Sequence, residues 1–190
     1  AEEARQAATL LRAAVPTVAA EHAKRAAAAR ERQSTAIEGA LADPTAKQYL
    51  GTTPAHLAGE TVISIRGTIL RALYAGASKR CDIIETASRL DDEDYSASFD
   101  QRTRIVTPLG KEKKRAEPMW EQGGEQYWLS TAGERALKTC NPLQALQAAD
   151  KDVVAAVAAL EQMSRGDSAA VAALEQAERA EAAVAAAEEE

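Results

Sequence analysis

Histidine and cysteine, the residue types that most often carry chemistry, are few in this chain and do not cluster. His22, His56, Cys81 and Cys140 show none of the spacings of a metal site, and no histidine lies close to either cysteine in the sequence. The glycine patterns that hold phosphate groups are also missing. We therefore predict that the chain is not an enzyme and carries no metal or other cofactor. For the cysteines we expect two unpaired buried thiols, with a Cys81–Cys140 disulfide as the alternative.

Charged side chains are the remaining candidates for function, and most of the excess charge is acidic and C-terminal. The net charge is −6, and residues 142–190 hold 3 basic and 10 acidic residues. A dedicated nucleic-acid-binding domain is usually basic, so this balance disfavours that class. Local basic clusters instead suit an acidic partner surface, unless they are only the solvated face of a helix. The cations expected to contact a partner are Lys24, Arg25, Arg30, Arg32, Lys111, Lys113, Lys114 and Arg115.

Alanine dominates the apolar residues. The chain is 46% hydrophobic, yet it has 45 alanines and a single Phe. Alanine favours helices but buries little surface, so we expect many helices around a thin core. No apolar run reaches the roughly 18 residues that a membrane-spanning helix needs, so we predict no such helix. A thin core also favours a protein that docks on a larger partner.

One long helix over residues 53–90 is the predicted centre of the fold. Thr53 is a suitable N-cap, and Pro54 suits the first helical position. Apolar residues recur at three- and four-residue spacing along this stretch, which places them on one face. Gly67 and Gly76 weaken such a helix, so we expect a close neighbour there or a break near Gly76.

Two regions are predicted, with a boundary between residues 49 and 50. Residues 1–49 form alanine-rich N-terminal helices, separated into two pieces at Pro16. Residues 50–190 form a helical bundle with an irregular aromatic insert at 95–130. Within that insert, residues 119–129 form a short β-hairpin or an ordered loop.

The last part of the bundle is predicted to be a C-terminal helical hairpin that turns at Ser164–Ser168. With the long central helix, it places the chain in the all-α class.

The segment ETVISIRGTILRALYAG contains an aliphatic turn, then Ile65-Arg66-Gly67, then further aliphatic residues. It resembles a region of the PsbQ-type extrinsic proteins of photosystem II, and the C-terminal hairpin is similar in layout to the last two helices of that family. The resemblance implies a non-enzymatic accessory subunit that docks on a large complex from the chloroplast thylakoid lumen and stabilises it. This subunit would be peripheral to the membrane, would bind no nucleic acid, and would begin at Ala1 as a processed form. We add Arg66, Trp120 and Trp128 to its expected partner contacts.

An alternative interpretation starts from GGEQYWLSTAGERAL. This segment resembles the wing end of winged-helix DNA-binding domains, where an aromatic strand is followed by Ser or Thr, Gly and a short helix. TILRALYAG and KRCDIIETA would be the first two helices, residues 119–129 the wing and residues 95–106 the recognition helix of a dimeric regulator in the cytoplasm or nucleoid. Gln101, Arg102 and Arg104 would face DNA, and the Lys111 to Arg115 run would contact phosphates.

Overall fold

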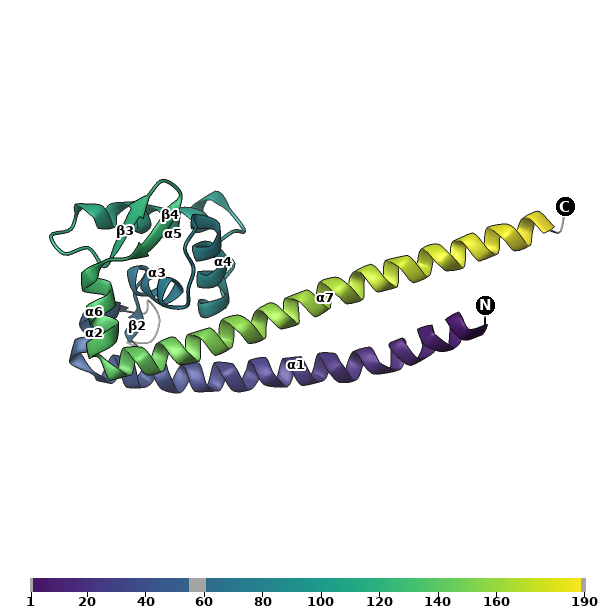
Figure 1. Ribbon diagram of the computed structural model, residues 1–190, viewed down its shortest axis with the longest axis horizontal. Helices are drawn as coiled ribbons and strands as arrows, with labels where there is room; N and C mark the ends of the chain where they lie inside the picture. Colours follow the sequence, from purple (N-terminus) through teal and green to yellow (C-terminus); the bar gives the residue numbers. More distant parts are fainter. Residues whose placement is uncertain (1, 55–60, 189–190) are drawn as a thin grey trace. The chain divides into compact units, whose positions relative to one another are not determined.

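The computed structural model describes the backbone of residues 2–54 and 61–188 and the side chains of residues 18–52 and 62–166; His56 lies outside them. Helices dominate this part of the chain, which confirms the predicted all-α class (Figure 1). The elements are, in order, α1 (Glu2–Ala42), α2 (Pro44–Leu50), β1 (Thr52–Pro54), β2 (Thr61–Ile63), α3 (Ile65–Tyr74), α4 (Arg80–Asp91), α5 (Phe99–Lys111), the 3₁₀ helix η1 (Glu112–Lys114), β3 (Trp120–Gly123), β4 (Gln126–Leu129), α6 (Thr131–Thr139) and α7 (Asn141–Glu188).

α1 and α7 each run through two compact units. The main unit spans Ala27–Ala155, and the terminal unit comprises Ala1–Ala26 and Ala156–Glu190. The boundary predicted between residues 49 and 50 falls inside the main unit. Of the cations expected to contact a partner, Lys24 and Arg25 lie in the terminal unit, where both are exposed.

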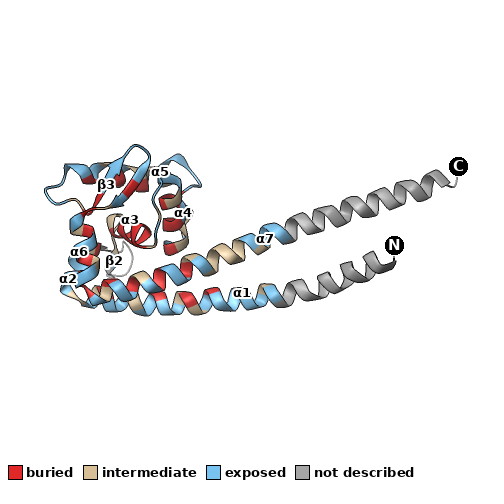
Figure 2. Ribbon diagram, viewed as in Figure 1, coloured by how far each residue is buried: buried red, intermediate tan, exposed pale blue. Residues whose placement is uncertain are grey.

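α3 is the centre of the main unit's core. All of its residues from Gly67 to Tyr74 are buried (Figure 2). Ile69 and Leu70 are completely buried, and Ile83 of α4 and Ile105 of α5 belong to the same apolar cluster. Each such side chain contributes about 1.5–3 kcal/mol when it is buried. α3 is therefore the element on which α4, α5 and the strand β4 assemble.

The long helix predicted over residues 53–90 is wrong, because the structure divides this stretch into two strands and two helices. β1 pairs with β2 in antiparallel register, with Thr53 opposite Val62. β2 consists of Thr, Val and Ile, whose branching favours extended backbone and lowers helix propensity. Thr53 therefore belongs to a strand and is not the N-cap of a helix.

Two local signals set the ends of α3. At its start, the Ser64 hydroxyl accepts a hydrogen bond from the backbone N–H of Gly67 at 3.2 Å, which makes Ser64 the N-cap. Just past its end, Gly76 has a φ of 106°, a left-handed value that glycine adopts without strain. The predicted break near Gly76 is confirmed.

The close neighbour predicted at Gly67 is also confirmed. A Cβ atom placed there would lie 2.1 Å from the carbonyl oxygen of Leu50 and 2.6 Å from a methyl of Ile63. Because Leu50 ends α2 and Gly67 lies in the first turn of α3, the absence of a side chain at Gly67 lets these two helices meet backbone to backbone.

α1 and α7 are both continuous, so two predicted interruptions are wrong. α1 runs from Glu2 to Ala42 through Pro16, and α7 runs from Asn141 to Glu188 through the predicted turn at Ser164–Ser168. Glycine in a helix costs about 1 kcal/mol relative to alanine and proline about 3 kcal/mol. The many alanines on both sides favour helix strongly enough to offset single breakers.

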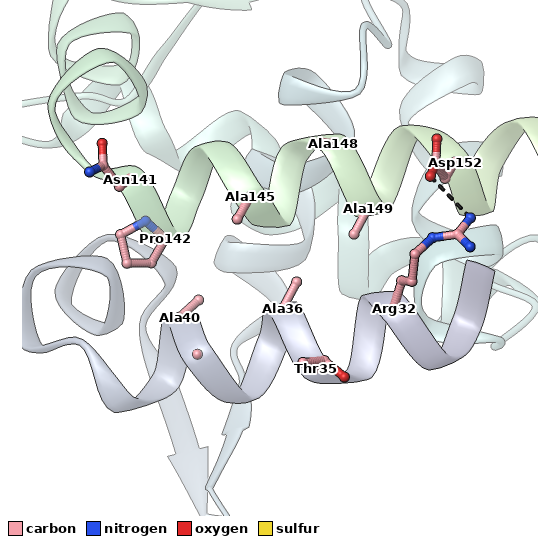
Figure 3. A pocket seen from close by; sticks show the side chains of 11 residues that line it. Arg32, Thr35, Ala36, Ala40, Asn141, Pro142, Ala145, Ala148, Ala149 and Asp152 are labelled. Atoms are coloured by element: carbon pink, nitrogen blue, oxygen red, sulfur yellow. Dashed lines mark hydrogen bonds and ion pairs between the residues drawn. The ribbon is translucent and has the colours of Figure 1, made fainter. Parts of the chain in front are cut away.

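Figure 3 shows how α1 and α7 meet in the main unit. The methyl groups of Ala36 and Ala40 face those of Ala145 and Ala149 across a groove of about 620 Å³. Because these side chains are small, they leave the groove open where larger residues of the two helices would interlock. An ion pair of 3.1 Å between Arg32 and Asp152 closes one end of the groove.

The aromatic insert contains the hairpin that the sequence offered as one of two alternatives. β3 pairs antiparallel with β4, Trp120 lies opposite Leu129, and Gly123 lies opposite Gln126. The two-residue loop begins at Gly124, whose φ of 63° suits the first central position of such a turn.

Candidate functional site

α4 and α5 are consecutive helices joined by a short turn, and α5 presents one face to solvent. Ser98 starts α5, because its hydroxyl accepts from the backbone N–H of Gln101 at 3.1 Å. Ile105 and Leu109 are buried and hold α5 on the core. The helix predicted over residues 95–106 is shifted in the structure: it begins at Phe99, because Tyr95 is buried in the turn before it, and it ends at Lys111.

Four residues at four-residue spacing form a stripe along the outer side of α5. They are Phe99, Thr103, Thr107 and Lys111, and we call them the α5 stripe. Residues four apart lie on one helix face, and this face is opposite Ile105 and Leu109. Phe99 is 81% exposed, although apolar side chains of this size are usually buried. The stripe thus offers one aromatic ring, the hydroxyl of Thr107 and one ammonium group, whereas the hydroxyl of half-buried Thr103 donates to the carbonyl of Phe99 at 2.8 Å.

The β3–β4 hairpin lies beside these helices and pairs with the segment that precedes α4. The backbone N–H of Tyr127 donates to the carbonyl of Ser78 at 2.7 Å, and Lys79 forms an isolated antiparallel bridge with Gln126. The chain therefore passes through α3, a short extended segment, α4, α5 and the hairpin, and the hairpin returns to the extended segment. Gln122, Gly123, Gly124, Glu125 and Gln126 at its tip are all exposed.

Glu112, just after α5, gathers two of the cations expected to contact a partner. Its carboxylate accepts from Arg66 Nε and Nη2 at 2.9 and 2.6 Å, lies 3.1 Å from Arg115 Nε, and accepts from the backbone N–H of Met119 at 2.8 Å. Burial by itself would raise the pKa of Glu112, but the hydrogen bonds from Arg66 and Met119 and the charges of both arginines outweigh it and lower the pKa. Arg66 is mostly buried in this cluster, whereas Arg115 remains 57% exposed.

The two tryptophans have different environments. Trp120 is 1% exposed, donates from Nε1 to the carbonyl of Leu109 at 3.2 Å, and has the Arg66 guanidinium 5.7 Å from its ring centroid. It is a core residue and is not available for the partner contact expected of it. Trp128 is 46% exposed and covers Gly123, where a Cβ would lie 2.7 Å from its ring.

The three residues predicted to face DNA are not equivalent. Arg102 is exposed. Arg104 pairs with Glu93 and donates to the side-chain oxygen of Gln101 at 2.9 Å. Arg104 thus contacts Gln101 and the turn before α5, and neither residue belongs to the α5 stripe.

The remaining predicted cations separate into two groups. Lys111, Lys113 and Lys114 are exposed at the end of α5 and in η1. Arg30 and Arg32 lie on α1, where Arg30 donates to the carbonyl of Leu90 at 2.9 Å and Arg32 pairs with Asp152. The structure does not bring these two groups together.

The sequence interpretation missed Lys79 and Arg80, which are exposed where α4 begins. The sequence contains a signal for the start of this helix, since Asp82 is three residues after Lys79 and its carboxylate accepts from the backbone N–H of Lys79 at 3.3 Å. A helix that starts there leaves Lys79 and Arg80 at its exposed end.

A buried ion-pair network joins α1, α3, α4 and α7. Arg71 is 2% exposed and donates to the fully buried Asp150 at 2.9 and 2.7 Å and to Asp91 at 3.2 Å. Asp150 also accepts from Gln33 of α1 at 2.9 Å. Burial alone would lower the pKa of Arg71, but the hydrogen bond and charge of Asp150, together with Asp91, more than offset it and raise the pKa. The network fixes α7 on α3.

Cys81 and Cys140 are unpaired, as expected. Cys140 is buried but Cys81 is exposed at the start of α4, so the expectation that both thiols are buried is wrong for Cys81.

Within the described part of the chain, no group of three or more His, Cys, Asp or Glu side chains is placed to hold a metal ion. None of the helices described there is both long and apolar enough to cross a bilayer. Comparison with protein-family models, with curated proteins and with solved structures finds no match to this chain.

Proposed function

We propose that the chain binds duplex DNA through α5 and the β3–β4 hairpin, in the manner of a winged helix. The observation that carries the proposal is the order and pairing of the elements: α3, the extended segment at Ser78–Lys79, α4, α5, and a hairpin that pairs back on that segment. In DNA-binding domains of this kind the second helix of the α4–α5 pair enters the major groove, and the hairpin contacts the neighbouring backbone.

The residue types of the α5 stripe suit contacts with base edges. Threonine hydroxyls donate to or accept from any base, and a phenyl ring or a threonine methyl packs against the methyl group of thymine. Such a role also accounts for the exposure of Phe99, whose ring is large and apolar. Lys111 would reach a guanine or a phosphate at the end of the stripe.

Exposed cations next to the stripe suit the phosphate backbone. They lie in η1 and at the start of α4: Lys113, Lys114, Lys79 and Arg80. Asp100 of α5 and Glu121 and Glu125 of the hairpin are also exposed, and they reduce the net positive charge. We therefore expect few phosphate contacts and a modest dependence on salt, because each phosphate neutralised adds about 0.9 to the slope of log K against log salt.

The proposal is tested by fluorescence anisotropy with a labelled mixed-sequence duplex, titrated between about 50 and 200 mM salt. The double variant Lys113→Ala/Lys114→Ala should bind more weakly, with a slope lower by about 2. The matched control is Lys47→Ala/Lys151→Ala, which removes two exposed lysines from α2 and α7 and should leave the slope unchanged. Equal losses in both double variants, or no binding by the unmodified chain at 50 mM salt, would refute the proposal.

Docking on photosystem II from the thylakoid lumen stays a prediction, as do the dimeric state and the location of a DNA-binding regulator. Arg66 and Gly67, on which the docking hypothesis depends, make contacts inside the chain: Arg66 with Glu112, and Gly67 with Leu50. For this reason we place DNA binding first. Release of the chain from thylakoid membranes by about 1 M salt, where the Debye length is about 3 Å, would support docking instead.

A further inference from the structure

A pocket of about 490 Å³ opens in the main unit next to the turn that leads into α5. This volume falls within the roughly 300–1,000 Å³ that is usual for small-ligand sites. Side chains of α1, β2, α3 and α4 form an aliphatic wall: Ile37, Leu41, Val62, Ile63, Ile65 and Leu90. An apolar wall of this extent suits a ligand with a hydrophobic body.

The opposite side of the pocket is polar and has an excess of negative charge. Asp91, Glu93, Arg71 and Arg104 line it. Arg71 joins this side to the core: its Nη1 donates to Asp91 at 3.2 Å, and its Nε and Nη2 donate to Asp150, which is not part of the lining. Three carboxylates (Asp91, Glu93 and Asp150) thus share two guanidinium groups (Arg71 and Arg104), which leaves one negative charge in excess.

Arg104 shows where a positive charge is accommodated. Its guanidinium lies 5.4 Å from the ring centroid of Tyr95 and pairs with Glu93. The Tyr95 ring is held firmly, since the side chain is 1% exposed and its hydroxyl donates to Asp91 at 2.9 Å. A fixed aromatic face beside a carboxylate is a strong arrangement for a cation.

We propose that this pocket binds a lipophilic cation. The hydrophobic body of the ligand would cover the aliphatic wall, and its charge would take the position of the Arg104 guanidinium over Tyr95 and beside Glu93. Arg104 has somewhere to go, because its side chain is 45% exposed at the rim of the pocket.

The ligand would also act on α5, and this consequence rests on the proposed function. Arg104 belongs to α5, and its pair with Glu93 joins that helix to the turn after α4. A ligand that displaces Arg104 would loosen this connection and free a cation on the helix proposed to enter DNA. Ligand binding and DNA binding would therefore be coupled.

The experiment compares two probes of the same shape and opposite charge, tetraphenylphosphonium and tetraphenylborate, by isothermal titration calorimetry with the full chain and without DNA. Tetraphenylphosphonium should bind saturably with one site per chain, and tetraphenylborate should bind at least about tenfold more weakly, a difference of about 1.4 kcal/mol. Equal affinity for the two probes, or no binding of tetraphenylphosphonium, would overturn the proposal.

Three variants locate the site. Glu93→Gln should weaken tetraphenylphosphonium binding about tenfold, whereas Glu85→Gln, which removes an exposed carboxylate of α4 outside the pocket, should not. Arg104→Ala should strengthen binding, because it removes the cation that competes with the probe. Weaker binding by Arg104→Ala, or equal effects of Glu93→Gln and Glu85→Gln, would contradict the assignment. Circular dichroism confirms that each variant is folded.

Titrating the full chain with tetraphenylphosphonium and, separately, with duplex DNA distinguishes the pocket proposal from the DNA-binding proposal. Binding of tetraphenylphosphonium without any binding of duplex DNA would refute the proposed function alone. DNA binding without binding of tetraphenylphosphonium would refute the pocket assignment alone.

Discussion

Asp150 is the residue whose replacement we expect to destabilise the main unit most clearly. It is completely buried and accepts two hydrogen bonds from Arg71 and one from Gln33. Asp150→Ala would leave the Arg71 guanidinium without its closest counter-charge inside the core. Removing one partner of a buried ion pair costs about 3–5 kcal/mol, and Asp91 still neutralises part of the charge. We therefore expect a loss near the lower limit, about 3 kcal/mol.

Urea denaturation followed by circular dichroism measures this loss. With a slope of about 2 kcal/mol per molar urea, the midpoint should fall by about 1.5 M. Asp152→Ala is the matched control, two residues along the same helix: its ion pair with Arg32 is 57–59% exposed, so the change should be within about 1 kcal/mol. An Asp150→Ala midpoint no lower than that of Asp152→Ala would refute the account of the buried network. The double variant Arg71→Met/Asp150→Leu should recover most of the loss, because apolar replacement of a whole buried pair is often neutral.

Two further predictions concern the core and its pH dependence. Gly67→Ala should destabilise the chain by about 1–3 kcal/mol, because the new methyl group clashes with the carbonyl of Leu50. Gly39→Ala is the control: nothing lies within 4 Å of the new methyl group, so this change should stabilise the chain by about 0.5–1 kcal/mol. Similar melting temperatures of the two variants would contradict the close contact at Gly67. The lowered pKa of Glu112 contributes stability above its ordinary value of 4.5, and this contribution is lost as the pH falls through the folded-state value. Acid unfolding of Glu112→Gln should therefore show a shallower loss of stability below about pH 4.5 than the unmodified chain, and identical profiles would exclude Glu112 as a source of acid sensitivity.

Local signals in the sequence predict part of the fold. The break near Gly76 follows from the conformational freedom of one residue, and the hairpin follows from aromatic segments on both sides of Gly123 and Gly124. The start of α3 shows the limit of such signals. Thr53 and Ser64 are both suitable caps, and only the pairing of β1 with β2 decides between them.

Other features depend on contacts between distant residues. Arg71 and Asp150 are 79 positions apart, and the one trace in the sequence is that Asp150 interrupts the apolar spacing of Leu143, Leu146 and Val153. An acidic residue in an apolar stripe indicates a buried partner but does not name it. α7 continues through Gly166 because the alanines around it favour helix by more than one glycine disfavours it, so a single glycine is a weak signal for a helix end.

The candidate site was predicted in outline and not in detail. A hairpin within residues 119–129 and a helix after Tyr95 follow from the sequence, and the structure has β3–β4 and a helix over Phe99–Lys111 there. Of the three residues predicted to face DNA, Arg102 and Arg104 are exposed and Gln101 is half-buried, and the contacts of Arg104 with Glu93 and Gln101 could not be read from the sequence. Trp120 was expected at the surface for a similar reason: its burial depends on Arg66 and Leu109, which are distant in sequence or belong to another element.

Mapping of backbone amide shifts by NMR is the most direct test of DNA binding through α5 and the hairpin. Duplex DNA is added to the isotope-labelled chain at about 50 mM salt, where phosphate contacts are strong. The account predicts shift changes at Thr103, Thr107, Lys111 and Gly124, and none in the part of α7 from Leu143 to Val153. Changes confined to α1 and α7, or no change at all with excess duplex, would contradict it.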